Sequence, residues 1–200
     1  MVDMIVIENE TIYQKEALED THYRNCEIRF EDTEHFIRNV VFERCTFIYG
    51  DKHKWDIRDC TFKNCDLSLG GFEDSYLMNV TFDYCKLMSF SLHQCYLHNL
   101  LISNSMGQYF GISDSKIRSA TFKSTPFHTA SFMHLDHKNM TFHECRLDEC
   151  NFEETRLKGI DLRSCEFSYI LYSPHLVKGL KIRSDQAIIF AIQMGLEVDY

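Results

Sequence analysis

Hydrophobic side chains recur at every fifth position along most of this chain. Thirty positions spaced by five run from Ile37 to Ile182, and 27 of them are apolar or aromatic. The exceptions are Lys52, Gly107 and His137. With 44% hydrophobic residues overall, about thirteen apolar residues would be expected at these positions by chance. The sequence is therefore organised as a repeat of five residues.

We call the recurring apolar residue the centre position and the residue two places before it the small position. The small position usually carries Cys, Ser, Ala or Gly, and the other three positions of each repeat carry nearly all the charge. Cys26 precedes Ile28 by the same two residues, in an N-terminal segment of different phase. The other eight cysteines all occupy small positions: Cys45, Cys60, Cys65, Cys85, Cys95, Cys145, Cys150 and Cys165.

A period of five fits neither an α-helix nor a flat strand, but it fits a chain that turns a corner after each repeat. If four such sides close one coil, successive coils stack at the strand spacing of ~4.8 Å, and roughly seven coils give a rod about 30 Å long. A narrow rod has no room for two large inward side chains on each side. One inward position must then be small, which explains the pairing of Cys, Ser, Ala or Gly with Phe, Leu or Ile.

Residues twenty apart should lie above one another in such a rod. The small positions taken at intervals of twenty from Cys45 to Cys165 then form a column of Cys, Ser and Thr. The small positions taken in the same way from Val40 to Ile160 form a column of bulkier residues. Stacked thiols in a dry interior act as small hydrophobic groups. Zinc-type spacings such as C-x₂-C do not occur, so we predict no metal and no cofactor. Most histidines fall at outward positions: His93, His98, His128, His134 and His143.

The units "CTFKN", "CDLSL", "CRLDE", "CNFEE" and "IDLRS" resemble the pentapeptide-repeat family, whose units read roughly Ala-Asp/Asn-Leu-x-x. The resemblance covers about residues 36–182 and is highly specific for the fold, less so for function. It implies an all-β chain folded as a right-handed quadrilateral β-helix. We therefore predict this β-helix, followed by a C-terminal α-helix.

Charge and composition exclude several classes of protein. The net charge of −9 argues against direct nucleic-acid binding. Residues 1–34 hold ten acids and three basic residues, so −7 of the total lies there. No apolar run approaches the ~18 residues of a membrane span, and the N-terminus lacks the basic region of a signal peptide. We predict a cytoplasmic protein with reduced thiols and no membrane association.

Two segments interrupt the pattern without changing the count of five. Residues 48–56 place Lys52 at a centre, and residues 103–111 place Gly107 at one. Each segment is either a distorted coil or a projecting loop, and loops on a rigid scaffold often contact partners. Gln108 and Tyr109, within the second segment, are therefore candidate partner-binding residues.

One side of the predicted rod gathers acidic residues. It is centred on Phe72 and the residues that follow at intervals of twenty, and its outward positions include no Lys or Arg between Phe72 and Glu154. The adjacent side carries Arg58, Arg118, Lys138 and Lys158, and residues 87–113 carry no charge. An ordinary solvated surface and a surface for a cationic partner both remain open. The candidate partner-binding acids are Glu73, Asp74, Asp114, Glu153 and Glu154.

The two ends should close the rod, because a β-helix exposes strand edges and an open core there. We predict that residues 1–35 form a cap and a first irregular coil, that 36–182 form the β-helix, and that 183–200 form a terminal element. Ser184 suits a helix N-cap, Gly195 suits the C′ position, and "LEVDY" would follow as a strand. A helix that is apolar nearly all round should be buried on two sides. A homodimer is predicted through Ile188, Ile189, Ala191, Ile192, Leu196 and Val198.

The segment "LKIRSDQAIIFAIQMGLEV" resembles the C-terminal element of the topoisomerase-protecting branch of the family, which includes quinolone-resistance and microcin- and albicidin-immunity proteins. This resemblance implies a dimeric DNA mimic that binds DNA gyrase and protects it from a toxin or antibiotic. The alternative is a repeat scaffold with a different protein partner. An enzyme is not expected, because no nucleophile–base pair, P-loop or suitably spaced carboxylate pair occurs.

Overall fold

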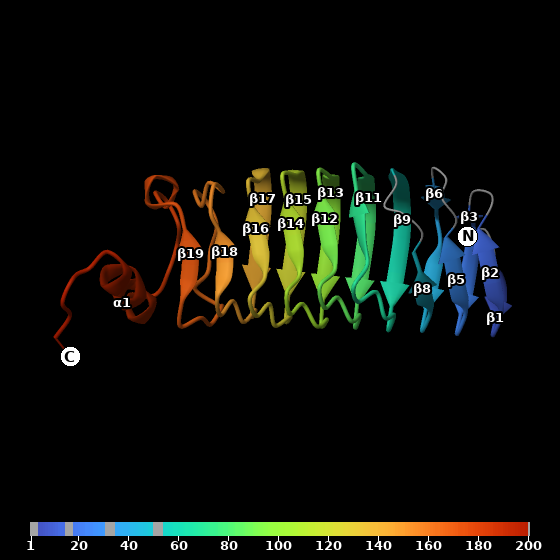
Figure 1. Ribbon diagram of the computed structural model, residues 1–200, viewed down its shortest axis with the longest axis horizontal. Coiled ribbons are helices and arrows are strands. Elements are labelled where there is room, and N and C mark those ends of the chain that lie inside the picture. The colour runs from blue at the N-terminus through green and yellow to red at the C-terminus, as the bar shows by residue number, and fades with distance from the viewer. Residues whose placement is uncertain (1–3, 15–17, 31–34, 50–53, 200) are drawn as a thin grey trace.

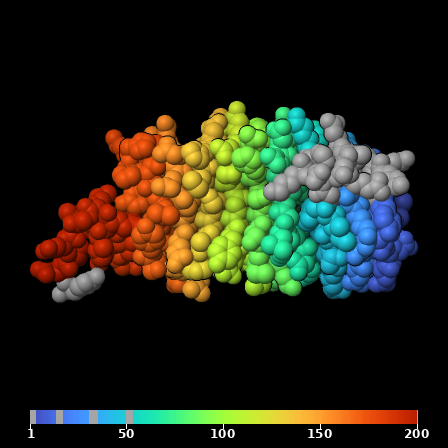
Figure 2. Space-filling view, viewed as in Figure 1, coloured from blue at the N-terminus to red at the C-terminus, as the bar shows by residue number. Residues whose placement is uncertain are grey.

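The chain folds as a right-handed, four-sided β-helix with one α-helix at its C-terminal end, as the repeat predicted. The computed structural model describes residues 4–14, 18–30, 35–49 and 54–199. Parallel strands stack along the long axis, with the N-terminus at one end and α1 at the other (Figure 1). In the space-filling view successive parts of the chain form successive bands across the rod (Figure 2).

The largest sheet runs the length of the regular coils. Its longer strands turn a corner and so cover two sides of the rod. The strands on its main path are β1 (Ile5–Glu8), β4 (Thr21–Arg24), β7 (Val41–Glu43), β9 (Trp55–Lys63), β11 (Tyr76–Asp83), β13 (Tyr96–Ser103), β15 (Lys116–Lys123) and β17 (Asp136–His143), joined by β3 (Leu18–Glu19) and β6 (His35–Arg38).

Two smaller sheets and a row of isolated bridges form the remaining sides. One sheet contains β10 (Gly71–Glu73), β12 (Ser91–His93), β14 (Gly111–Ser113), β16 (Ser131–Met133), β18 (Cys150–Phe152) and β19 (Ile170–Tyr172). The other contains β2 (Thr11–Gln14), β5 (Glu27–Phe30) and β8 (Thr46–Ile48).

We name the four sides after the centre residues of one coil: the Phe82, Leu87, Leu92 and Leu97 sides. Residues twenty apart pair in parallel on each of them. Phe82 pairs with Ile102 and Leu77 with Leu97, while Leu92 pairs with Phe72. On the Leu87 side, isolated bridges join residues 66, 86 and 106. The predicted period of twenty is confirmed.

The N-terminal segment also forms coils, but shorter ones. Ile5 pairs with Thr21, a separation of 16 residues, and His22 pairs with Val41, a separation of 19. The separation reaches twenty where Trp55 pairs with His35. These shorter coils account for the shifted phase of Cys26.

The interior is filled by the centre and small residues. Along the Phe82 side, ring centroids of Phe42 and Phe62 lie 5.0 Å apart, and those of Phe62 and Phe82 lie 4.8 Å apart, in stacked orientation. All nine cysteines are free and buried. Seven of the thiols also donate to carbonyl oxygens of the preceding coil, as Cys65 Sγ does to Phe42 O at 3.3 Å. The interpretation of the cysteines as small interior groups is confirmed.

The corners adopt left-handed backbone conformation at the residue two places after a centre. In one coil the φ angles are 54° at Asn79, 54° at Tyr84, 54° at Ser89 and 53° at Gln94. Asn favours this conformation, whereas Tyr and Ser adopt it at a cost that the stacked coils must offset.

Residues 103–111 form a regular coil and do not project. Met106 forms an isolated parallel β-bridge with Lys86, and the Gly107 N–H donates to Pro126 O at 3.0 Å. In the other interruption, residues 50–53 and hence Lys52 lie outside the described residues. At the third exception, His137 is half-buried, and its Nε2 lies 2.5 Å from Arg156 O, to which it donates.

The C-terminal helix closes the last coil. After a short 3₁₀ turn, η1 (Pro174–Leu176), the helix α1 spans Ser184–Gln193 with Arg183 as N-cap, so the prediction of Ser184 was one residue late. The cause is Gln186, whose Oε1 accepts from the Arg183 N–H at 2.8 Å. Gly195 has φ +80° beyond the helix, as predicted. The predicted terminal strand was wrong, because described residues 196–199 form none.

Candidate interaction surfaces

The structure gathers the predicted acids along one corner of the rod. Asp74, Asp114 and Glu154 occupy equivalent positions where the Leu92 side meets the Leu97 side, each with positive φ. They recur at every second coil, about 10 Å apart at ~4.8 Å per coil. Gln94 and His134 occupy the coils between them. We call this row the acidic corner.

The adjoining outward column adds Glu73 and Glu153, four coils apart. Glu73 ends β10, and the register of that sheet places His93, Ser113 and Met133 between the two acids. The five predicted acids therefore share one side. Glu73 and Asp74 form one pair and Glu153 and Glu154 form another, and Asp114 lies midway between the pairs in a largely uncharged stretch.

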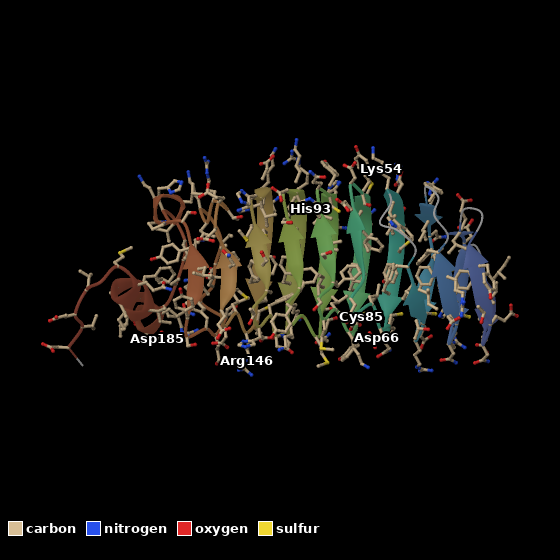
Figure 3. All side chains as sticks on the ribbon, viewed as in Figure 1. Lys54, Asp66, Cys85, His93, Arg146 and Asp185 are labelled. Atoms are coloured by element: carbon tan, nitrogen blue, oxygen red, sulfur yellow. The ribbon has the colours of Figure 1, made fainter. Side chains whose placement is uncertain are left out.

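Side chains of neighbouring coils fix the acids of the corner. Lys54 Nζ lies 3.6 Å from Asp74 Oδ2, and His93 Nδ1 lies 3.5 Å from Asp114 Oδ2. Figure 3 shows Lys54 and His93 at one long edge of the rod, opposite Asp66 and Arg146. Glu154 Oε1 accepts from Ser173 Oγ at 2.9 Å. Sequence reasoning missed Lys54, although it stands twenty residues before Asp74.

A hollow of about 270 Å³ opens beside the acidic corner. Its lining includes two cations, Lys54 and Lys116, and two acids, Asp74 and Asp114. The exposed ring of Tyr76 and the ring of Tyr96 flank it, with centroids 6.0 Å apart.

Gln108 and Tyr109 lie away from the acidic corner. Gln108 faces outward on the Leu87 side, and Tyr109 occupies the corner between that side and the Leu92 side, with φ 57°. Tyr109 itself is 56% exposed, Met106 in the same coil is 52% exposed, and Leu69, at the same corner two coils earlier, is 84% exposed. We call these three residues the apolar patch, and two of them, Met106 and Tyr109, lie in the stretch of residues 87–113 that carries no charge, as the sequence indicated.

Helix α1 presents one face to the last coil and another to solvent. Phe190 is buried and Ile189 packs against the core. The Gln186 amide donates to Leu162 O at 3.1 Å and to Cys165 O at 2.8 Å. Of the residues predicted at a dimer contact, Ile188, Ala191 and Val198 are half-buried, whereas Ile192 and Leu196 are exposed.

Several interior cysteines have little nucleophilic character. Burial raises the pKa of the Cys60, Cys95 and Cys150 thiols to about 12, which suppresses the nucleophilic thiolate. Across the described ranges, no three His, Cys, Asp or Glu side chains are placed to hold a metal ion. No helix in the described parts of the chain is long and apolar enough to cross a membrane.

Family comparison agrees with this geometry. Residues 55–132 match the family model described as pentapeptide repeat region, and residues 139–169 match the one described as pentapeptide repeats. Together they span 109 of the 200 residues. The chain belongs to the pentapeptide-repeat family. A search of the curated proteins finds no significant match.

Several solved structures resemble this pentapeptide-repeat chain. A trypsin-treated form of QnrB1, a plasmid-mediated fluoroquinolone resistance protein, is 16% identical with a TM-score of 0.43, covering 98% of this chain and 100% of its own. HetL, involved in heterocyst differentiation regulation in the cyanobacterium Nostoc sp. strain PCC 7120, is 13% identical with a TM-score of 0.49, covering 90% and 86%. Rfr23 from the cyanobacterium Cyanothece 51142 is 11% identical with a TM-score of 0.36, covering 64% and 91%. Identities this low concern the fold alone.

Proposed function

We propose that this pentapeptide-repeat protein is a non-enzymatic binding protein that engages a type II topoisomerase, DNA gyrase or a relative, and protects it from a toxin or antibiotic. The observation that carries the proposal is the acidic corner, where Asp74, Asp114 and Glu154 stand in register along a rigid rod. A DNA-binding surface is cationic, so a row of carboxylates held at fixed spacing complements it. The resemblance of the C-terminal segment to the topoisomerase-protecting branch selects the partner.

The spacing of the carboxylates defines how far the mimicry extends. Each strand of duplex DNA carries one phosphate per ~3.4 Å of axis. The acidic corner carries one carboxylate per ~10 Å, with Glu73 and Glu153 beside its two ends. The contact therefore engages a few cationic side chains of the enzyme rather than a continuous phosphate-binding groove. The uncharged stretch between the acids adds polar and aromatic contact.

Dimerisation is part of the proposal. Ile192, near the end of α1, and Leu196, just beyond the helix, are 52% and 59% exposed. Pairing of this apolar face with a second copy removes it from water and doubles the length of the rod. A monomeric mass that does not change with concentration contradicts this part alone.

The test is gyrase supercoiling and drug-stabilised DNA cleavage, with and without the purified protein. The protein should lower supercoiling or drug-stabilised cleavage in a dose-dependent way. Charge reversal in Glu153→Lys/Glu154→Lys should weaken the effect at least tenfold. Glu144→Lys/Glu149→Lys is the matched control, because it makes the same charge change in the same coil, and Glu144 and Glu149 are corner residues of positive φ like Glu154.

Two outcomes would contradict the proposal or the contact that it assigns. If the wild-type protein neither binds gyrase nor alters cleavage, the topoisomerase proposal fails. If it binds and both charge-reversal variants behave alike, the acidic corner is not the contact.

A second candidate function is supported by the apolar patch. Met106 and Tyr109 are exposed on and beside the Leu87 side, within residues 87–113, which carry no charge, and Leu69 is exposed at the same corner as Tyr109 two coils earlier. Tyr and Met are enriched at the cores of protein interfaces. A scaffold that docks a different protein through this patch would lose its partner on Met106→Asp/Tyr109→Asp and be indifferent to Glu153→Lys/Glu154→Lys.

A further inference from the structure

The Leu97 side carries an unbalanced row of cations toward the C-terminal end of the rod. From residue 116 onward this side holds six basic residues and one acid, Asp136, a balance of +5. Four of the cations recur at intervals of twenty, one per coil. They are Arg118, Lys138, Lys158 and Lys178, with Lys116 and Arg156 in the neighbouring column. We call these six residues the basic track.

Most of the basic track lacks ion-pair partners. Arg118 Nη2 lies 3.8 Å from Asp136 Oδ2, but Lys138, Arg156, Lys158 and Lys178 form no ion pair with any residue in the described ranges. On the other sides of the same coils the arginines are paired with nearby carboxylates, whereas Lys123 and Lys181 form no ion pair within the described ranges. Arg163 lies 2.6 Å from Asp161, and Arg183 lies 3.0 Å from Asp185. Most of the unpaired cations of these coils therefore lie on the Leu97 side.

Aromatic rings continue the same side toward the N-terminus. Tyr76 and Tyr96 occupy the outward column that Lys116 continues, and Tyr76 is 59% exposed. The Arg118 guanidinium carbon lies 5.9 Å from the centroid of the Tyr96 ring, which joins the rings to the basic track. Beside the rings lies the hollow of about 270 Å³. Stacking rings that lead into a line of cations are the two components of a surface for single-stranded nucleic acid.

From this arrangement we infer that the Leu97 side binds single-stranded nucleic acid. Its bases stack on Tyr76 and Tyr96, and its phosphates follow Arg118, Lys138, Lys158 and Lys178. This inference goes beyond the proposed function and does not rest on it. The corner next to the cations carries Asn139, Gly159 and Gly179, which add no negative charge.

The acidic corner on the other edge of this side selects a single strand over a duplex. A single strand can keep its phosphates on the basic track while its neutral bases lie toward Asp114 and Glu154. The second strand of a duplex would bring phosphates against these carboxylates, where like charges repel.

The net charge of −9 does not oppose binding at this place. Residues 1–34 hold −7 of it, and the described parts of this segment, residues 4–14 and 18–30, lie at the opposite end of the rod from α1 (Figure 1). About four coils, or ~19 Å, separate them from Lys116. That distance exceeds the Debye length of about 8 Å at physiological salt, so their repulsion is largely screened. The argument from the net charge of the whole chain against nucleic-acid binding therefore does not apply to the Leu97 side.

The test uses the full-length protein and fluorescein-labelled oligo(dT) of about 16 nucleotides, read by fluorescence anisotropy across a salt series. Lys138→Gln/Lys158→Gln/Lys178→Gln should weaken binding and lower the salt slope by about two, at about 0.7 per phosphate contact. Lys63→Gln/Lys86→Gln/Lys123→Gln makes the same charge change on other sides and should leave binding within about twofold. Tyr76→Ala/Tyr96→Ala should weaken binding about tenfold or more through lost stacking.

Three results overturn the inference. The first is no binding of oligo(dT) at low salt by the folded protein. The second is equal loss in the two lysine triple variants, which shows diffuse attraction instead of a track. The third is displacement of oligo(dT) by poly-L-glutamate at equal charge together with no effect of the tyrosine substitutions, which assigns the side to an acidic polypeptide. Thermal melting of each variant checks that it folds.

Discussion

The ring of Phe127 fills the interior space that a side chain at Gly107 would occupy. A Cβ on Gly107 would lie 2.4 Å from Phe127 Cδ1 and 2.5 Å from Cε1, and Phe127 itself is fully buried. Both residues belong to the centre column of the Leu87 side, in successive coils. The glycine that interrupts the five-residue repeat is therefore compensated by a large neighbour in the next coil.

Gly107→Ala should lower the free energy of unfolding by about 1–3 kcal/mol, because the added methyl group overpacks the core against a ring that has no free space. Gly111→Ala is the control, since its Cβ would meet nothing closer than Ser91 Cβ at 4.0 Å. Chemical denaturation of both variants measures the difference. Gly107→Leu/Phe127→Leu should recover stability relative to Gly107→Leu alone, and a failure to recover contradicts the proposed compensation.

Buried hydroxyls at small positions link one coil to the next. Ser105 Oγ accepts from the Cys85 N–H at 3.0 Å and donates to Ser103 O at 2.8 Å. Ser105→Ala should cost about 1–3 kcal/mol in the free energy of unfolding, because the buried Cys85 N–H loses its acceptor. Ser105→Cys should cost less, since Cys65 and Cys85 stand in the same column. Ser131→Ala, at an outward position, serves as control; equal losses in the alanine variants would argue against the hydroxyl contact.

Gln186 fastens the C-terminal helix to the last coil. It is 1% exposed, and its side chain pairs with Leu162 O, Cys165 O and the Arg183 N–H. Gln186→Leu should leave the Arg183 N–H unpaired, at a cost of about 1–3 kcal/mol. It also removes one of the two donors at Leu162 O and at Cys165 O, which still accept from the Cys165 N–H and from Arg183 Nη1. We expect local opening of α1 before global unfolding, seen as faster amide hydrogen exchange over residues 186–194. Gln108→Leu, on the surface, should leave that exchange unchanged.

The thiols should be inert while the chain is folded. Burial raises the pKa of Cys60, Cys95 and Cys150 to about 12, so little thiolate forms at pH 8. Ellman's reagent should react slowly with native protein and with all nine cysteines after denaturation. A hydrogen bond from Cys145 lowers the pKa of Cys165, but this thiol is fully buried and its carbonyl anchors α1, so it should react only when the helix opens. Rapid reaction of several native thiols contradicts this expectation.

The sequence predicted the fold well because its rule is local and repeated. Each inward pair must combine one large and one small side chain, so the period of five, the columns such as Phe42–Phe62–Phe82 and the burial of the cysteines follow from the residues themselves. The same counting placed Asp74, Asp114 and Glu154 on one side of the rod. The helix after residue 183 was visible as an apolar run between a polar residue and Gly195.

Other features depend on what the neighbouring coil contributes, and only the tertiary structure decided them. Tyr84 takes a left-handed φ of 54° because the stacked corners require it, although its own preference lies elsewhere. Arg183 rather than Ser184 caps α1 because buried Gln186 reaches back to its N–H. The gap at Gly107 is filled by a ring twenty residues later, and the coils before Trp55 shorten to 16 and 19 residues. A repeat fixes which side chains point inward, but the exact space each one finds is set by contacts between coils that are distant in sequence.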